Sequence, residues 1–237
     1  MMAMRISKAE FAKMIDHSIV KAQATDQDVK RYCEEAKTYG FGGIAVNPVY
    51  VAYAKELLKG TDIKVDATVG FPFGAQCLEA KIIETKKVLS DGADELDIVM
   101  NIGKFKSGDY DYVENELRQI IETAKEEGEK LGKNIVTKVI IEIGYLTDDE
   151  IITASRIVSK AGADFVKTAT GFGPRGPTLK DIELIKKGIS GKTQIKAAQG
   201  IRTLKQALEL VKAGAKRLGI STSVNIIKEF TSEYIEI

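Results

Sequence analysis

Two lysines carry the candidate chemistry of this sequence. Lys167 lies in the short apolar run Asp164-Phe165-Val166-Lys167, and Lys196 lies in Gln194-Ile195-Lys196-Ala197. Both runs are typical of strands, and a lysine on a buried strand is unfavourable unless it is paired or used. Two ammonium groups in one dry cavity lower each other's pKa, and desolvation adds to this, which leaves one amine neutral near pH 7. A neutral amine can attack a carbonyl and form a Schiff base, an electron sink for making or breaking a carbon–carbon bond.

A carboxylate in a neighbouring apolar run could move the protons that such a reaction needs. Asp97 lies in Glu95-Leu96-Asp97-Ile98-Val99 and could act through a water. Further polar residues at predicted strand ends are Asp16, Ser18, Asn47, Asn101, Lys138, Glu142 and Thr170. The alternative interpretation is a salt-bridged core layer built from Lys138, Glu142, Asp97 and the two lysines. Spacing alone leaves both interpretations open.

Three glycine-bearing segments after predicted strands indicate a phosphate site. They are Thr170-Gly171, Gln199-Gly200-Ile201-Arg202 and Gly219-Ile220-Ser221-Thr222-Ser223. The last two follow the seventh and eighth predicted strands, where barrel enzymes frequently bind phosphate through backbone amides. The hydroxyl residues of the third segment could instead be helix caps. Two loops at the expected places favour phosphate binding.

These residues need a scaffold that brings several strand ends together, and the chain supplies a regular alternation of strands and helices. Predicted strands are centred near Asp16, Ala45, Val65, Leu96, Val139, Val166, Ile195 and Leu218. Each is followed by a predicted helix, and a capping box at Ser7 and Glu10 indicates an extra helix before the first strand. Eight such units predict an α/β fold, a single (β/α)8 TIM barrel over residues 1–237 with an extra N-terminal helix. The fifth strand is expected at 137–143, and the sixth at 164–169 with Lys167 in its middle. No G-x-G-x-x-G follows the first strand, which disfavours an open doubly wound sheet.

Composition limits the classes of partner. The chain of 237 residues has 35 basic and 34 acidic residues, a net charge of +1, and gives no reason to expect nucleic acid or an anionic membrane as a partner. Two cysteines without zinc spacing are read as reduced thiols, and the N-terminus lacks a signal peptide. We therefore expect a cytoplasmic protein that needs no cofactor. A zinc site is not expected either, because His17 is the only histidine. Small-molecule substrates are the expected partners, and a homo-oligomer, either a dimer or a tetramer, is a further hypothesis.

Several segments, taken together, resemble the signatures of the deoxyribose-phosphate aldolase family. The matching segments are Asp16-His17, Val46-Asn47-Pro48, Val69-Gly70-Phe71-Pro72-Phe73-Gly74, Asp94-Glu95-Leu96-Asp97-Ile98-Val99-Met100-Asn101-Ile102-Gly103, Val166-Lys167-Thr168-Ala169-Thr170-Gly171-Phe172-Gly173 and Ile195-Lys196-Ala197-Ala198-Gln199-Gly200-Ile201-Arg202-Thr203. The resemblance implies a class I, metal-independent aldolase that cleaves 2-deoxy-D-ribose 5-phosphate reversibly to acetaldehyde and D-glyceraldehyde 3-phosphate. It implies that Lys167 is the Schiff-base lysine, that Asp97 is a proton donor and acceptor, and that Lys196 perturbs Lys167 and takes part in proton transfer. The residues expected to bind substrate or phosphate are Asp16, Ser18, Asn47, Lys138, Thr170, Gly171, Gly200, Arg202, Gly219, Ser221 and Thr222.

The sequence departs from the family pattern near the expected phosphate site. Ala198 and Gln199 stand where the family usually has serine and glycine. Because Gln199 replaces a glycine next to the phosphate, we expect close backbone approach or a positive φ there to be compromised. Serine is likewise usual at Ala169, and threonine at Ser18 and Ile220. Two rival functions therefore stay open: another lysine-dependent aldolase with a different phosphorylated acceptor, and a non-catalytic phosphosugar-binding barrel. Some family members use a C-terminal tyrosine, and the role of Tyr234 is left open.

Overall fold

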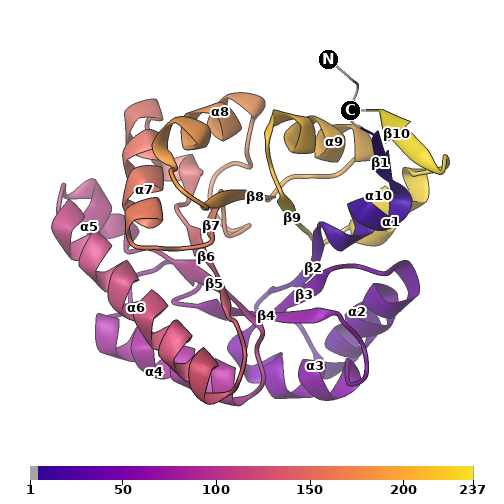
Figure 1. Ribbon diagram of the computed structural model, residues 1–237, viewed down its shortest axis with the longest axis horizontal. Helices are drawn as coiled ribbons and strands as arrows, with labels where there is room; N and C mark the ends of the chain where they lie inside the picture. Colours follow the sequence, from indigo (N-terminus) through magenta and orange to yellow (C-terminus); the bar gives the residue numbers. More distant parts are fainter. Residues whose placement is uncertain (1–4, 237) are drawn as a thin grey trace.

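A closed barrel of parallel strands surrounded by helices forms the protein, whose computed structural model describes residues 5–236 (Figure 1). Around the barrel the strand order is β2-β3-β4-β5-β6-β7-β8-β9. The barrel strands are β2 (Ile15–Ile19), β3 (Gly43–Val46), β4 (Lys64–Val69), β5 (Glu95–Val99), β6 (Val136–Ile140), β7 (Phe165–Lys167), β8 (Gln194–Ala198) and β9 (Arg217–Ile220). The helices are α1 (Lys8–Lys13), α2 (Asp26–Tyr39), α3 (Val51–Leu57), α4 (Leu78–Ser90), α5 (Ile102–Lys106), α6 (Tyr110–Lys130), α7 (Asp148–Lys160), α8 (Leu179–Gly188), α9 (Leu204–Ala213) and α10 (Ser223–Glu229). The predicted α/β barrel with an extra N-terminal helix is confirmed.

Local sequence signals define where several of these helices begin. Ser7, Thr25, Thr147 and Thr178 each cap a helix, and in each case the side chain three residues later completes a capping box. Each box satisfies backbone N–H groups that would otherwise lack a partner in the first helical turn. The helices are therefore held at fixed starting points, which positions the loops that follow the strands.

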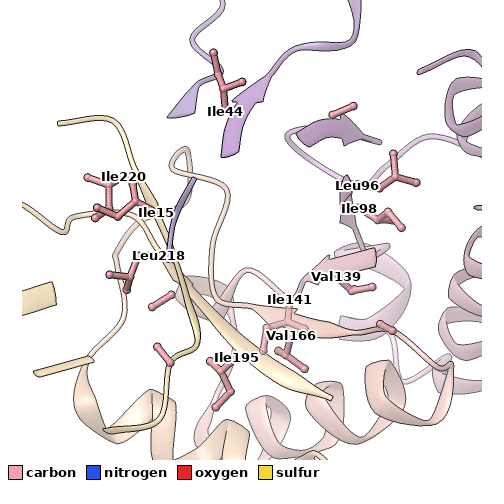
Figure 2. Packing of buried hydrophobic residues seen from close by; sticks show 14 of the residues in the cluster. Ile15, Ile44, Leu96, Ile98, Val139, Ile141, Val166, Ile195, Leu218 and Ile220 are labelled. Atoms are coloured by element: carbon pink, nitrogen blue, oxygen red, sulfur yellow. The ribbon is translucent and has the colours of Figure 1, made fainter. Parts of the chain in front are cut away.

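Alternation along the strands separates an apolar outer face from a polar interior. Val166 and Ile195 belong to the buried cluster that includes Ile182 and Ile185 of α8, and Figure 2 shows the two strand residues pointing toward the helices. Successive strand residues point to opposite faces. Lys167, next to Val166, therefore points into the barrel interior, and Lys196, next to Ile195, does the same.

Two predicted strands are shorter than expected. β6 ends at Ile140 and not at Ile143, because Glu142 takes a left-handed conformation with φ of 51° and residues 143–145 form a 3-10 turn. β7 ends at Lys167 and does not continue to Ala169. The catalytic candidate is thus the last residue of its strand, at the mouth of the barrel and not in the middle of the strand. The short helix α5 was also not predicted.

A small antiparallel sheet joins the two ends of the described chain. β1 (Arg5–Ser7) pairs with β10 (Tyr234–Glu236), and Ser7 is the partner of Tyr234. The two strands lie beside each other outside the barrel (Figure 1). None of the helices between residues 5 and 236 is long and apolar enough to cross a membrane.

Candidate active site

Lys167 ends β7 beside Lys196, and both ammonium groups contact one carboxylate. The two lysines are register partners on adjacent strands. The Nζ atom of Lys167 lies 2.5 Å from Oδ2 of Asp97, and the Nζ atom of Lys196 lies 2.9 Å from each of the two Asp97 oxygens. Asp97 lies on β5, which is separated from β7 by β6. Its contact with Lys167 is direct, whereas the sequence suggested a link through a water.

A layer of charged side chains fills the barrel interior beneath Lys167, and we call it the charge layer. Its members are the carboxylates of Asp16, Asp66, Glu95 and Asp97 and the cations of Lys138, Lys167, Lys196 and Arg217. The Nζ atom of Lys138 lies 2.7 Å from Asp66 and 2.5 Å from Glu95. When all eight groups are charged, four negative and four positive groups balance each other. This balance makes their burial tolerable, because an unpaired charge would be strongly disfavoured in the interior.

The charge layer gives its lysines different pKa directions. Burial is the largest influence on the pKa of Lys167 and lowers it; Asp97 acts in the opposite direction, and the Lys196 ammonium adds to the lowering. Burial also acts to lower the pKa of Lys196, but the carboxylates of Asp16, Asp66 and Asp97 outweigh it and raise that pKa. Burial, together with the nearby Asp97 charge, raises the pKa of Asp66 to about 6. The environment therefore shifts the pKa of Lys167 toward the neutral amine and the pKa of Lys196 toward the charged form.

The two interpretations of the lysines are compatible. A salt-bridged core layer does exist, although Glu142 is not part of it, because its carboxylate accepts hydrogen bonds from the backbone N–H and the hydroxyl of Thr170. Among the eight described members of the charge layer, Lys167 alone lines the cavity at the carboxyl ends of the strands. The layer therefore exposes one candidate lysine to the cavity, and its other described members stay in the ionic core beneath.

This cavity encloses about 360 Å³, enough for a small phosphosugar. Seven of the predicted site residues line it: Ser18, Lys167, Thr170, Gly171, Gly200, Gly219 and Ser221. Other lining residues that were not selected from the sequence as site residues include Lys21, Gln23, Ala45, Phe172 and Gln199. Lys21 and Gln23 follow the first barrel strand without a motif, so only the closure of the barrel brings them to the cavity.

The remaining predicted site residues lie in other places. Asp16, Asp97, Lys138 and Lys196 are buried in the charge layer. Asn47 donates from its side-chain amide to the carbonyl of Lys21. Arg202 is exposed, and Thr222 precedes α10. The structure therefore groups the predicted residues into a cavity lining and an ionic core beneath it.

Three members of the charge layer were missed from the sequence: Asp66, Glu95 and Arg217. Each is a charged residue in a largely buried barrel strand. Asp66 and Glu95 are register partners on adjacent strands. The rule applied to Lys167, that a charge on a buried strand needs a partner, would have identified them.

Asp16, Asp66 and Glu95 also lie close enough together to form a candidate group of metal ligands. Each of these carboxylates already contacts a cationic side chain: Lys196 and Arg217 at Asp16, Lys138 and Lys196 at Asp66, and Lys138 and Arg217 at Glu95. The protein therefore supplies the positive charge at this position itself.

Comparison with known proteins agrees with this geometry. The family described as DeoC/LacD family aldolase matches residues 11–228. The chain is 49% identical over 219 residues to the deoxyribose-phosphate aldolase of Aciduliprofundum boonei, covering 92% of this chain and 96% of the relative. It is 44% identical over 227 residues to that of Caldanaerobacter subterraneus, covering 96% of each. The tetrameric deoxyribose phosphate aldolase of Aeropyrum pernix superposes with a TM-score of 0.84 at 32% identity, covering 95% of this chain and 93% of that one.

Proposed function

The chain belongs to the DeoC/LacD family of aldolases, and from this premise we propose that it is a deoxyribose-phosphate aldolase. It cleaves 2-deoxy-D-ribose 5-phosphate reversibly to acetaldehyde and D-glyceraldehyde 3-phosphate through a lysine Schiff base. The observation that carries this conclusion is Lys167: a buried lysine of lowered pKa that lines the cavity and contacts Asp97.

In the proposed reaction the neutral amine of Lys167 attacks C1 of the open-chain sugar, and the carbonyl oxygen leaves as water. The C3 hydroxyl then loses its proton and the C2–C3 bond breaks. Its electron pair moves toward the iminium nitrogen, which leaves an enamine on Lys167 and releases the phosphorylated aldehyde. Protonation of C2 and hydrolysis of the imine release acetaldehyde and regenerate the lysine.

Asp97 and Lys196 are proposed to move these protons. Asp97 accepts hydrogen bonds from both lysines, so a proton that leaves Lys167 has an acceptor at hydrogen-bond distance. Lys196 keeps its charge because three carboxylates face it, and that charge disfavours a second positive charge on Lys167. Asp16 and Lys138 lie deeper in the charge layer. Their proposed effect on substrate binding is indirect, because they hold Asp97 and Lys196 in place.

The phosphate group is proposed to bind at the end of the cavity formed by the loops after β7, β8 and β9. Support comes from the lining residues Thr170, Gly171, Gly200, Gly219 and Ser221, three of which are glycines. Ser18, on β2 next to β9, is proposed to contact the sugar. Asn47, Arg202 and Thr222 are proposed to flank the site without lining it.

Three wider features complete the proposal. Residues 1–237 are proposed to form one domain, and the pairing of β1 with β10 supports this. Assembly into a homo-oligomer, a dimer or a tetramer, is supported by the tetrameric relative. Action in the cytoplasm is supported by the two free cysteines, Cys33 and Cys77.

One assay tests the proposed function directly. The purified protein should release acetaldehyde from 2-deoxyribose 5-phosphate, and borohydride added with acetaldehyde should attach a two-carbon group to Lys167, located by peptide mass mapping. Absence of acetaldehyde release, or attachment at a different lysine, would overturn the assignment.

A further inference from the structure

Gln199, the residue after β8, ties down the loop that follows the reactive lysine. Its side-chain Oε1 accepts the backbone N–H of Gly171 at 3.1 Å, and its Nε2 donates to the carbonyl of Gly173 at 2.8 Å. The loop also approaches the backbone of Gln199, because a Cβ added at Gly176 would lie 2.3 Å from the Gln199 carbonyl oxygen. Gln199 therefore fixes residues 171–176 from the β8 side.

This arrangement requires a strained backbone conformation at Gln199. Gln199 has φ of 81°, and together with Glu142 it is one of two positive-φ residues other than glycine between residues 5 and 236. A side chain in this region is disfavoured, whereas glycine adopts it readily. A glycine would therefore suit the backbone better, so the side chain of Gln199 contributes something that glycine would not.

The side chain changes which hydrogen-bond donors the cavity offers. Gly171 and Gln199 both line the cavity, at the end where the phosphate group is proposed to bind. With Oε1 of Gln199 on its N–H, Gly171 has no free donor for an anion. A phosphate oxygen that took this donor would have to displace the glutamine carbonyl.

We propose that Gln199 is a specificity-determining residue that weakens the preference of this enzyme for phosphorylated over unphosphorylated sugar by occupying the Gly171 amide. The inference rests on the proposed function and deepens it. An unphosphorylated sugar does not compete with the glutamine carbonyl, so its cleavage is little affected. A phosphorylated sugar loses one charge-assisted hydrogen bond or must break the Gln199 contact to gain it.

The test compares two substrates, 2-deoxyribose 5-phosphate and 2-deoxyribose, by the ratio of their kcat/KM values. In Gln199→Gly the Gly171 amide becomes free and the φ strain is relieved, so the variant should fold. Its ratio should rise about tenfold, the usual effect of one hydrogen bond to a charged group. In Gln199→Glu the acceptor stays on Gly171 and a negative charge is added, so the ratio should fall. Inhibition of 2-deoxyribose cleavage by inorganic phosphate should strengthen in Gln199→Gly and weaken in Gln199→Glu.

Arg175→Ala is the matched control for a loosened loop. Arg175 lies in the same loop and contacts Asp181 at 2.7 and 2.9 Å, outside the cavity lining. This variant should leave the substrate ratio unchanged.

A wild-type protein that cleaves neither sugar overturns the proposed function. A wild-type protein that cleaves both, with a ratio that stays constant or falls in Gln199→Gly, overturns the role of Gln199 alone.

Discussion

Lys167 and Lys196 face each other across adjacent parallel strands and share one oxygen, Oδ2 of Asp97, at 2.5 and 2.9 Å. The shared carboxylate offsets the repulsion between the two ammonium groups, so the pair can be buried. The two lysines still differ, because Lys196 has two further carboxylates within 2.8 Å and Lys167 lines the cavity. This asymmetry supports the proposal that Lys167 supplies the reactive amine and Lys196 a neighbouring positive charge.

Lys167→Arg should abolish both turnover and imine trapping without unfolding the barrel. A guanidinium stays protonated and cannot form an imine, while its charge can still face Asp97. Borohydride trapping with acetaldehyde measures the effect, and circular dichroism checks the fold. Lys21→Arg is the matched control, because Lys21 also lines the cavity but is exposed, and this variant should still trap. Aldolase activity in purified Lys167→Arg would sink the Schiff-base assignment.

Activity should survive removal of metal ions. The candidate ligands Asp16, Asp66 and Glu95 are already paired with lysine and arginine side chains, and the proposed chemistry needs an amine and not a Lewis acid. The measurement is the cleavage rate before and after dialysis against EDTA. A loss of rate that zinc restores would contradict this expectation.

The buried ion pair between Lys81 and Glu116 should matter for stability. Lys81 on α4 lies 3.0 Å from Glu116 on α6 and donates to the carbonyl of Val99, at the end of the strand that carries Asp97. Lys81→Met leaves a buried carboxylate without its partner, so the free energy of unfolding should fall by about 3–5 kcal/mol. The double variant Lys81→Met/Glu116→Leu removes both charges and should lose less.

Urea unfolding measures these values, and Lys86→Met serves as the control. Lys86 is exposed on the same helix, so its replacement should change the free energy of unfolding by no more than about 0.5 kcal/mol. A double variant that loses as much as Lys81→Met would show that the ion pair is not what the single variant disrupts.

The sequence predicted the barrel and much of the cavity because both depend on short-range patterns. Strand and helix alternation, capping boxes and glycine-bearing strand ends are all visible over a few residues, and closure of the barrel then brings Lys167 and Thr170 beside Gly200 and Ser221. The charge layer was only partly predicted. Arg217 contacts Asp16 and Glu95, which lie far from it in the sequence and come beside it only when the barrel closes.

The loop conformations could not be predicted from these short-range patterns. Nothing in the local sequence indicates that Glu142 turns the chain after β6, or that Gln199 bonds back to Gly171. The pairing of β1 with β10 joins segments from opposite ends of the chain, and neither is apolar enough to signal a strand by itself. Such features depend on tertiary contacts and become visible only in the folded protein.

The positive charge of Lys196 helps to lower the pKa of Lys167. Lys196→Met removes this charge, and Asp97 then hydrogen-bonds with Lys167 alone. Both changes raise the pKa of Lys167. Each pKa unit of increase reduces the fraction of neutral amine at pH 7 about tenfold, which corresponds to a free-energy cost of about 1.4 kcal/mol. The imine-trapping rate should therefore fall strongly at neutral pH and recover in part as the pH rises toward the new pKa.

The measurement is the trapping rate against pH for the wild type, Lys196→Met and Lys196→Arg. The arginine variant keeps a positive charge beside Lys167, so its pH profile should stay close to that of the wild type even if proton transfer is slower. Loss of proton transfer alone lowers the rate equally at every pH, whereas loss of the charge shifts the profile to higher pH. A uniform drop in Lys196→Met without such a shift would show that Lys196 does not set the pKa of Lys167.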